Sequence, residues 1–181
     1  MAKPSPDVCE QMQRILATEG WDRQLGEALF DAQNWHQSLS HPLPYSDALR
    51  NRLLDIGSRI DAAAFTTVLN RVRGSGLAGQ ADAIHWAFHA TRPPAFDALV
   101  KTIRDGLQTL GLEGMPGHSP HVTISYWAPT RLAVQKIAPI AWRIEELLLV
   151  ETCSSPYRDR TLASWPLRPV PAGLESQREL W

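Results

Sequence analysis

HQSL at residues 36–39 and HVTI at residues 121–124 share one pattern: a histidine, a hydroxyl residue two positions later, and then an aliphatic residue. In an extended strand, residues i and i+2 point to the same face. Each histidine should therefore share a face with its hydroxyl residue, Ser38 or Thr123. The pattern predicts a strand at both places, and two such strands side by side would turn both pairs toward one cleft.

The segments around the two motifs indicate one strand–helix–strand unit that is used twice. Serine caps predict helices that begin after Ser5 and Ser46, and glycine at positions 20 and 111 predicts helix ends. The other expected helices are 95–110 and a short one at 132–137. The expected strands are 35–39, 65–73, 83–89, 121–125, 142–153 and 162–167. This order predicts an α+β fold with two lobes related by a pseudo-twofold axis.

The chain of 181 residues is long enough for one domain with a substantial core. We expect residues 1–168 to form a single two-lobed domain, because no linker separates the two units. Residues 169–181 carry no periodic pattern and are expected to be a loosely ordered tail.

The charge balance argues against strong nonspecific binding of nucleic acid. The chain has 18 basic and 19 acidic side chains, a formal net charge of −1, in an ordinary globular composition. Any contact with RNA should involve a terminus or a short piece. A local basic rim remains open near Arg71 and Arg73, or near Arg158 and Arg160.

Targeting signals and cysteine chemistry give no sign of export. Cys9 and Cys153 lie far apart, which is neither a disulfide framework nor zinc-knuckle spacing. The first residues lack the apolar stretch of a signal peptide, and no run approaches the ~20 apolar residues of a membrane span. We expect a cytoplasmic protein with no membrane contact and no evident obligate protein partner.

The paired motifs suit hydrolysis of a phosphate diester. One neutral imidazole, of His36 or His121, accepts a proton from water while the other, protonated, gives one to the leaving oxygen. Histidine fits because its ordinary pKa lies near the working pH. The hydroxyls of Ser38 and Thr123 can donate hydrogen bonds to the phosphate oxygens. This scheme needs no metal and no cofactor.

The sequence resembles the two-histidine phosphoesterase superfamily, and within it the group of 2′-5′ RNA ligases and RNA 2′,3′-cyclic phosphodiesterases. The resemblance runs from about Ser5 to Leu167. It rests on DAQNWHQSL at 31–39, AIHWAFH at 83–89, SPHVTIS at 119–125 and the segment 157–167. It implies antiparallel sheets that flank a central cleft, and hydrolysis of a 2′,3′-cyclic phosphate to a 2′-phosphate. A reverse 2′-5′ ligation and a role in RNA processing are implied as well.

The resemblance carries roles onto four residues: His36 and His121 as the catalytic pair, Ser38 and Thr123 as phosphate ligands. Ser38 stands where threonine is commoner, and Tyr126 stands where RNA-directed members often have arginine. The implied substrate is an RNA terminus or a small cyclic nucleotide. Two alternatives stay open: a small cyclic phosphate such as ADP-ribose 1″,2″-cyclic phosphate, and a module that binds nucleotides or RNA ends without turnover.

Other residues permit other chemistry. His85, His89 and His118 could form a three-histidine zinc site, although no acidic residue supports it at a suitable spacing. Tyr126 and His85 are possible substrate contacts: Tyr126 could stack on a base, and His85 could line the cleft from the neighbouring strand. Trp86 and Trp127 could also stack, but core packing suits Trp86 better. Arg71 and Arg73 share a strand face and could meet phosphate, or could be solvated charges.

Overall fold

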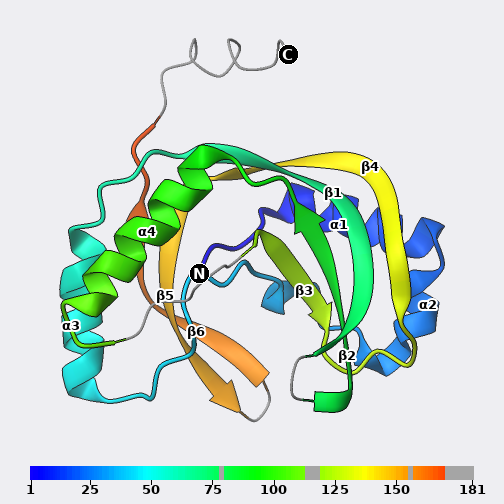
Figure 1. Cartoon of the computed structure of the whole chain (residues 1–181), viewed down its shortest axis with the longest axis horizontal. Helices are drawn as coiled ribbons and strands as arrows, with labels where there is room; N and C mark the ends of the chain where they lie inside the picture. The colour runs from blue at the N-terminus through cyan, green and yellow to red at the C-terminus, as the bar shows by residue number, and fades with distance from the viewer. Residues whose placement is uncertain (78–79, 113–118, 155–156, 170–181) are drawn as a thin grey trace.

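A computed structural model describes residues 1–77, 80–112, 119–154 and 157–169 of the chain. The fold is mixed α+β with antiparallel sheets, as the sequence predicted (Figure 1). The helices are α1 (Pro6–Thr18), α2 (Trp21–Leu25), α3 (Asp47–Ser58) and α4 (Pro94–Gln108), with 3-10 turns η1 (Gly26–Ala28) and η2 (Ala32–Asn34). The strands are β1 (Phe65–Leu77), β2 (Gln80–Ala90), β3 (His121–Ser125), β4 (Leu132–Ile144), β5 (Glu146–Ser154) and β6 (Tyr157–Pro166).

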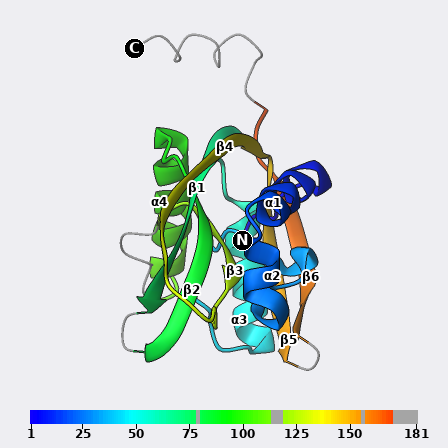
Figure 2. The same cartoon turned by 90° about the vertical axis from the view of Figure 1, so that its right-hand side faces the viewer.

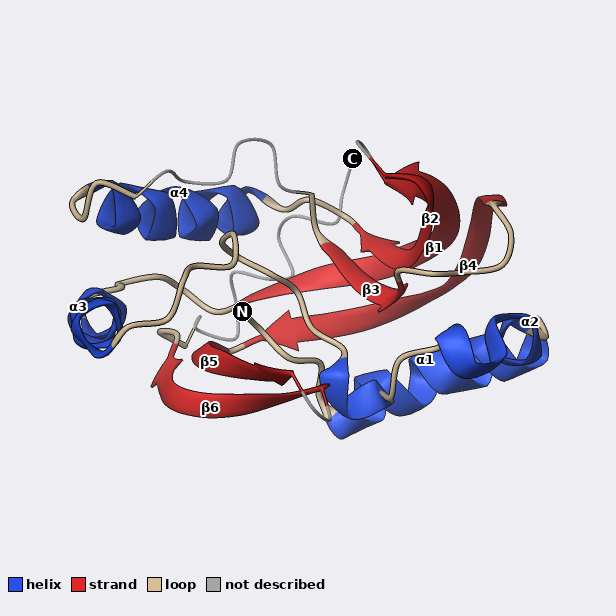
Figure 3. Cartoon of the chain, turned by 90° about the horizontal axis from the view of Figure 1, so that it is seen from below, coloured by secondary structure: helices blue, strands red, loops and turns tan. Residues whose placement is uncertain are grey.

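Two sheets of unequal size organise these elements. The larger has the order β3-β2-β1-β4, and the smaller is the β5-β6 pair. The helices α1 and α2 lie on one side of the larger sheet, while α3 and α4 lie at the other end of the molecule (Figures 2 and 3). Trp86 of β2 is fully buried on the covered face and meets the ring of Trp21 edge-on at 6.3 Å. The opposite face of the sheet carries the polar residues of the second motif.

The predicted helix starts are confirmed. The Ser5 and Ser46 side chains accept hydrogen bonds from the backbone N–H groups of Val8 and Leu49, which fixes where α1 and α3 begin. The helix expected at 95–110 is α4, which begins one residue earlier and ends two residues earlier. Gly111 follows it with φ of 71°, a backbone conformation that favours glycine.

The expected strand 35–39 is wrong. This segment makes only an isolated antiparallel bridge, between Ala2 and Gln37, and belongs to no sheet. Burial nevertheless alternates along it as in an extended backbone: Trp35, Gln37 and Leu39 are buried and the residues between them are half-buried. The face alternation that the motif argument needed therefore survives without a ladder of hydrogen bonds.

Two further elements differ from the expectation after the second motif. Residues 132–137 are not a helix but the first half of β4, whose Lys136 pairs with Arg71 of β1. Pairing with β1 determines the conformation of this segment and outweighs the weak helical periodicity of its sequence. The long strand expected at 142–153 is divided at Glu145 into β4 and β5, which belong to different sheets. The last strand, expected at 162–167, is β6 and begins at Tyr157.

A β-bulge corrects the expected faces of β1. Strict alternation along the expected strand 65–73 would put Leu69 on the face of Arg71 and Arg73, but the register shifts between Leu69 and Arg71. Leu69 therefore lies on the buried face with Val72, and Arg71 and Arg73 share the opposite face. A bulge inserts one residue into a strand, so the alternation changes phase at that point.

The last described residues return to the start of β1. Arg168 forms a parallel bridge to Ala63, and most of the tail expected to be loosely ordered, 170–181, lies outside the described residues. The single domain 1–168 remains a prediction. In the described part of the chain, no helix combines the length and apolar character needed to cross a bilayer.

Candidate active site

The second motif occupies an edge strand. His121 is the first residue of β3 and pairs with His89 of β2. Thr123 lies on the same face and pairs with Ala87. The Nδ1 atom of His121 lies 2.8 Å from the carbonyl oxygen of Ser119. A carbonyl only accepts hydrogen bonds, so Nδ1 carries the proton. In the neutral ring, Nε2 then carries the lone pair that can accept a proton.

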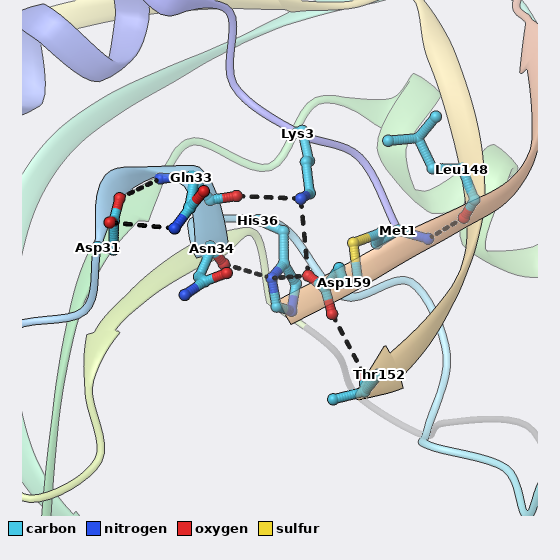
Figure 4. Close-up of polar contacts among 9 residues, drawn as sticks. All are labelled: Met1, Lys3, Asp31, Gln33, Asn34, His36, Leu148, Thr152 and Asp159. Carbon is cyan, nitrogen blue, oxygen red and sulfur yellow. Dashed lines mark hydrogen bonds and ion pairs between the residues drawn. The ribbon is translucent and has the colours of Figure 1, made fainter. Parts of the chain in front are cut away.

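The first motif orients its histidine in the same way. The Nδ1 atom of His36 lies 2.7 Å from the carbonyl oxygen of Asn34, again two residues earlier (Figure 4). This contact assigns the proton to Nδ1 and leaves Nε2 as the reactive nitrogen of His36 as well. Both candidate histidines therefore have the same tautomer, although one is on a strand and the other on an irregular segment.

Gln37 connects the two motifs directly. Its side chain is 1% exposed; Oε1 accepts a hydrogen bond from the backbone N–H of His121 at 2.5 Å, and Nε2 donates to the Ser38 carbonyl at 2.7 Å. The backbone of Gln37 also pairs with Ala2. The structure thus brings the first motif against the edge of β3, where the sequence had expected two paired strands.

The two hydroxyl groups differ in their surroundings. The Thr123 hydroxyl lies 3.0 Å from Nε2 of His85, a residue of the neighbouring strand. Ser38 is half-buried and lines a groove with a volume of about 490 Å³. That groove also contains His36 and Tyr126, but neither His121 nor Thr123 is in its lining. The first motif therefore lines the groove, whereas His121 and Thr123 of the second motif do not.

Tyr126 contacts both the groove and the histidines next to the second motif. Its side chain is 44% exposed, lines the groove, and stacks on the His85 ring at 5.9 Å between centroids. His85 in turn meets the His121 ring edge-on at 5.8 Å. The two predicted substrate contacts, Tyr126 and His85, thus lie between the groove and His121. Trp127 is 64% exposed. Trp86 is fully buried in the core, which is the role that the sequence favoured for it.

Asp159 is a site residue that the sequence reasoning missed. Its carboxylate is fully buried; Oδ2 lies 3.8 Å from Nδ1 of His36 and 3.7 Å from Nζ of Lys3 (Figure 4). Oδ1 accepts a hydrogen bond from the Thr152 hydroxyl at 3.2 Å. Burial lowers the pKa of His36, and the Asn34 carbonyl and the Asp159 charge oppose that shift. The sequence contained one signal for this residue. Asp159 stands between Arg158 and Arg160, and neighbouring residues of a strand point to opposite faces, so a strand here predicts the acid on the other face from the two arginines.

His85 and His89 lie on either side of His121. The His89 ring stacks on His121 at 5.9 Å between centroids. Burial and the charges of His121 and Arg73 lower the pKa of both His85 and His89 to about 4. These two rings are therefore neutral at neutral pH.

The zinc alternative finds no support in this arrangement. His85 and His89 are on a strand, where an i, i+4 pair is about 13 Å apart, too far for one metal ion. His118 lies outside the described residues. No cluster of three or more potential metal ligands occurs among the residues that are described.

The chain is similar to known proteins in its structure but matches none by sequence in the two sequence comparisons. No protein-family model and no curated protein matches the sequence. A crystal structure of a phosphoesterase matches with a TM-score of 0.73 and 17% identity, over 92% of this chain and 95% of that one. LigT of E. coli in its apo form matches with a TM-score of 0.70 and 20% identity, over 92% and 94%. The chain has the LigT fold.

A third match supports the same fold. The protein TT0787 of Thermus thermophilus has a TM-score of 0.66 and 21% identity, over 93% of this chain and 96% of that one. The resemblance to two-histidine phosphoesterases inferred from the motifs is therefore confirmed for the fold. LigT itself has been crystallised with 3′-AMP, NADP+, ATP and phosphate.

Proposed function

We propose that the chain is a phosphodiesterase that hydrolyses 2′,3′-cyclic phosphates to 2′-phosphates, with His36 and His121 as its acid–base pair. The observation that carries this proposal is the shared orientation of the two rings. Each donates Nδ1–H to a carbonyl two residues earlier, and Gln37 ties the two motifs together. The LigT fold and the nucleotides bound by LigT support a nucleotide as substrate.

The reaction needs one proton acceptor and one proton donor. Nε2 of His121 takes a proton from water, and the water oxygen attacks phosphorus. The bond between phosphorus and the 3′ oxygen breaks, and that oxygen takes a proton from Nε2–H of His36. The product has a 2′-phosphate and a free 3′-hydroxyl. Ser38 and Thr123 donate hydrogen bonds to the nonbridging oxygens, where negative charge increases.

The surrounding charges support this assignment of roles. Asp159 lies beside His36 and favours its protonated form. His121 instead stands on the sheet face that carries Arg71 and Arg73. The carboxylate beside His36 is the basis for assigning the acid role to His36, which leaves the base role to His121. Ligation of a 2′-5′ bond would follow the same steps with a 5′-hydroxyl in place of water: His121 takes the proton of that hydroxyl, its oxygen attacks phosphorus, and the bond to the 3′ oxygen breaks as that oxygen takes the proton of His36.

A small cyclic phosphate is the second candidate substrate. The groove beside His36 is about 490 Å³, within the usual size of a small-molecule site. Several leucines line it, and Arg50, the only arginine or lysine among the described residues of its lining, is 3.2 Å from Asp47. A mononucleotide or ADP-ribose 1″,2″-cyclic phosphate suits this groove better than a long RNA strand does.

The test is turnover of a 2′,3′-cyclic mononucleotide in EDTA by the wild type, His36→Ala and His121→Ala. General acid–base catalysis predicts a loss of roughly 10²- to 10⁴-fold in each variant, and a bell-shaped pH profile in the wild type. Circular dichroism of each variant serves as the folding control. Equal rates in the three proteins would refute the pair. Tight binding of the 2′-phosphate product without turnover would indicate a binding module instead.

A further inference from the structure

A row of four directly paired residues crosses the larger sheet from the candidate site. His121 of β3 pairs with His89 of β2, His89 pairs with Arg71 of β1, and Arg71 pairs with Lys136 of β4. Residues that are directly opposite in antiparallel strands share a face. All four side chains therefore lie on the face away from α1 and α2. A neighbouring row on that face contains Thr123, Ala87 and Arg73.

The positive charges in this row have no carboxylate partner in the described part of the chain. No carboxylate of the described residues forms an ion pair with Arg71, Arg73 or Lys136; the hydrogen-bond partner of Arg71 is the side-chain oxygen of Asn70, at 3.0 Å. Arg73 and Lys136 are exposed and Arg71 is half-buried. Like charges directly opposite each other in a sheet are destabilising. Arg71 opposite Lys136 is thus a cost that an anionic ligand would remove.

His89 supplies a second, independent observation. It is 9% exposed, and its Nε2 atom is buried with no hydrogen-bond partner among the described residues. Buried polar atoms are nearly always paired, so an unpaired one calls for an explanation. His89 lies between His121 and Arg71 in the row. A ligand that extends from His121 toward Arg71 would pass the atom that lacks a partner.

We infer that the row from His89 through Arg71 to Lys136 binds a second phosphate of the substrate, beyond the one that reacts. This inference rests on the proposed function, because it takes the reacting phosphate to lie at His121. Adjacent strands are about 4.8 Å apart, so Lys136 is about 14 Å from His121 along the row. One phosphate at His121 does not reach that far, whereas a substrate with a further phosphate does.

Two kinds of substrate carry such a phosphate. An RNA end provides the diester of the preceding nucleotide, and ADP-ribose 1″,2″-cyclic phosphate provides a diphosphate. A 2′,3′-cyclic mononucleotide carries the reacting phosphate alone. The chemistry that the row recognises is the same in both cases, and it separates these substrates from the simple mononucleotide.

The experiment measures kcat/KM for three substrates: a dinucleotide ending in a 2′,3′-cyclic phosphate, ADP-ribose 1″,2″-cyclic phosphate and a 2′,3′-cyclic mononucleotide. In Lys136→Gln and Arg71→Gln, the ratio of kcat/KM for a two-phosphate substrate to that for the mononucleotide should fall by about tenfold. The substrate whose ratio falls identifies the source of the second phosphate. For the dinucleotide, each variant should also make the affinity less dependent on salt concentration, because one charge–charge contact that salt screens is lost.

The matched control is Arg14→Gln, which removes one positive charge from α1, on the other side of the sheet. Its ratio should equal that of the wild type. A ratio unchanged in Lys136→Gln and Arg71→Gln, or lowered equally in Arg14→Gln, would overturn the inference.

A binding measurement separates this inference from the proposed function. Calorimetry compares adenosine 2′,5′-bisphosphate with adenosine 2′-monophosphate, and needs no turnover. The bisphosphate should bind more tightly to the wild type, and this preference should be lost in Lys136→Gln. If the wild type does not hydrolyse the substrates but still prefers the bisphosphate, the proposed hydrolase function is refuted and the second-phosphate site is supported. If it hydrolyses them but shows no preference for the bisphosphate, the proposed function is supported and the second-phosphate site is refuted.

Discussion

Gln37→Met tests the connection between the two motifs. The substitution nearly preserves the volume of the side chain but removes both hydrogen-bonding atoms. The backbone N–H of His121 loses its 2.5 Å contact, and the carbonyl of Ser38 loses its 2.7 Å contact. A buried group left unpaired costs about 1–3 kcal/mol. His121 and Ser38 are half-buried, so water compensates in part, and the lower end applies to each. We expect the free energy of unfolding to fall by about 2 kcal/mol.

The effect on activity should exceed the effect on folding. Gln37 holds the start of β3 against the first motif, and a small displacement of one histidine separates the acid from the base. Misplacement on the scale of 1 Å costs about 10²-fold in rate. We expect kcat/KM for a 2′,3′-cyclic mononucleotide to fall by at least about tenfold under conditions where the variant is fully folded.

Urea denaturation followed by tryptophan fluorescence gives the stability, since the chain has 7 tryptophans. The control is Gln33→Met, at an exposed glutamine whose Nε2 donates to the exposed Asp31 carboxylate; the stability of this variant should differ from that of the wild type by less than about 0.5 kcal/mol. The reasoning is wrong if Gln37→Met is as stable as Gln33→Met. It is also wrong if Gln37→Met is destabilised while kcat/KM stays at the wild-type value.

Three other perturbations have defined outcomes. Asp159→Asn removes a charge that raises the pKa of His36, so an NMR titration should give His36 a lower pKa than in the wild type; an unchanged value would show that the carboxylate does not act on the ring. His89 has a pKa of about 4 when folded against 6.5 when unfolded. The unfolded chain therefore binds protons first, and stability should be lost as the pH falls from 6.5 to about 4, less so in His89→Gln; equal thermal unfolding at about pH 7 and about pH 5 would contradict this. Gly57→Ala puts a Cβ atom against the ring of Trp165, which should cost about 1–3 kcal/mol in thermal unfolding, and full stability would show that the ring moves freely.

Local patterns explain which parts of the fold the sequence predicted. Ser5 and Ser46 cap helices through contacts with residues three positions away, so the signal and its effect lie within one turn. The alternation at β3 is equally local. By contrast, residues 132–137 form a strand because β1 lies beside them. The partner of a strand is distant in sequence, and no local propensity identifies it.

The candidate site divides in the same way. The two histidines were found because each motif contains its own hydroxyl residue at the spacing that an extended backbone requires. Asp159 was missed because its position beside His36 depends on how β6 packs against the first motif. The bulge between Leu69 and Arg71 was missed too, since it depends on the register of β1 against β2.

The sequence by itself determined the residue types: two histidines, each with a hydroxyl residue two positions later and therefore on its own face. Those relations follow from the covalent geometry of an extended chain. Only the tertiary structure decided what surrounds each ring, an acid beside His36 and a row of cations leading away from His121. Side chains from distant strands provide that environment, and their distances are set by packing and register rather than by spacing along the chain.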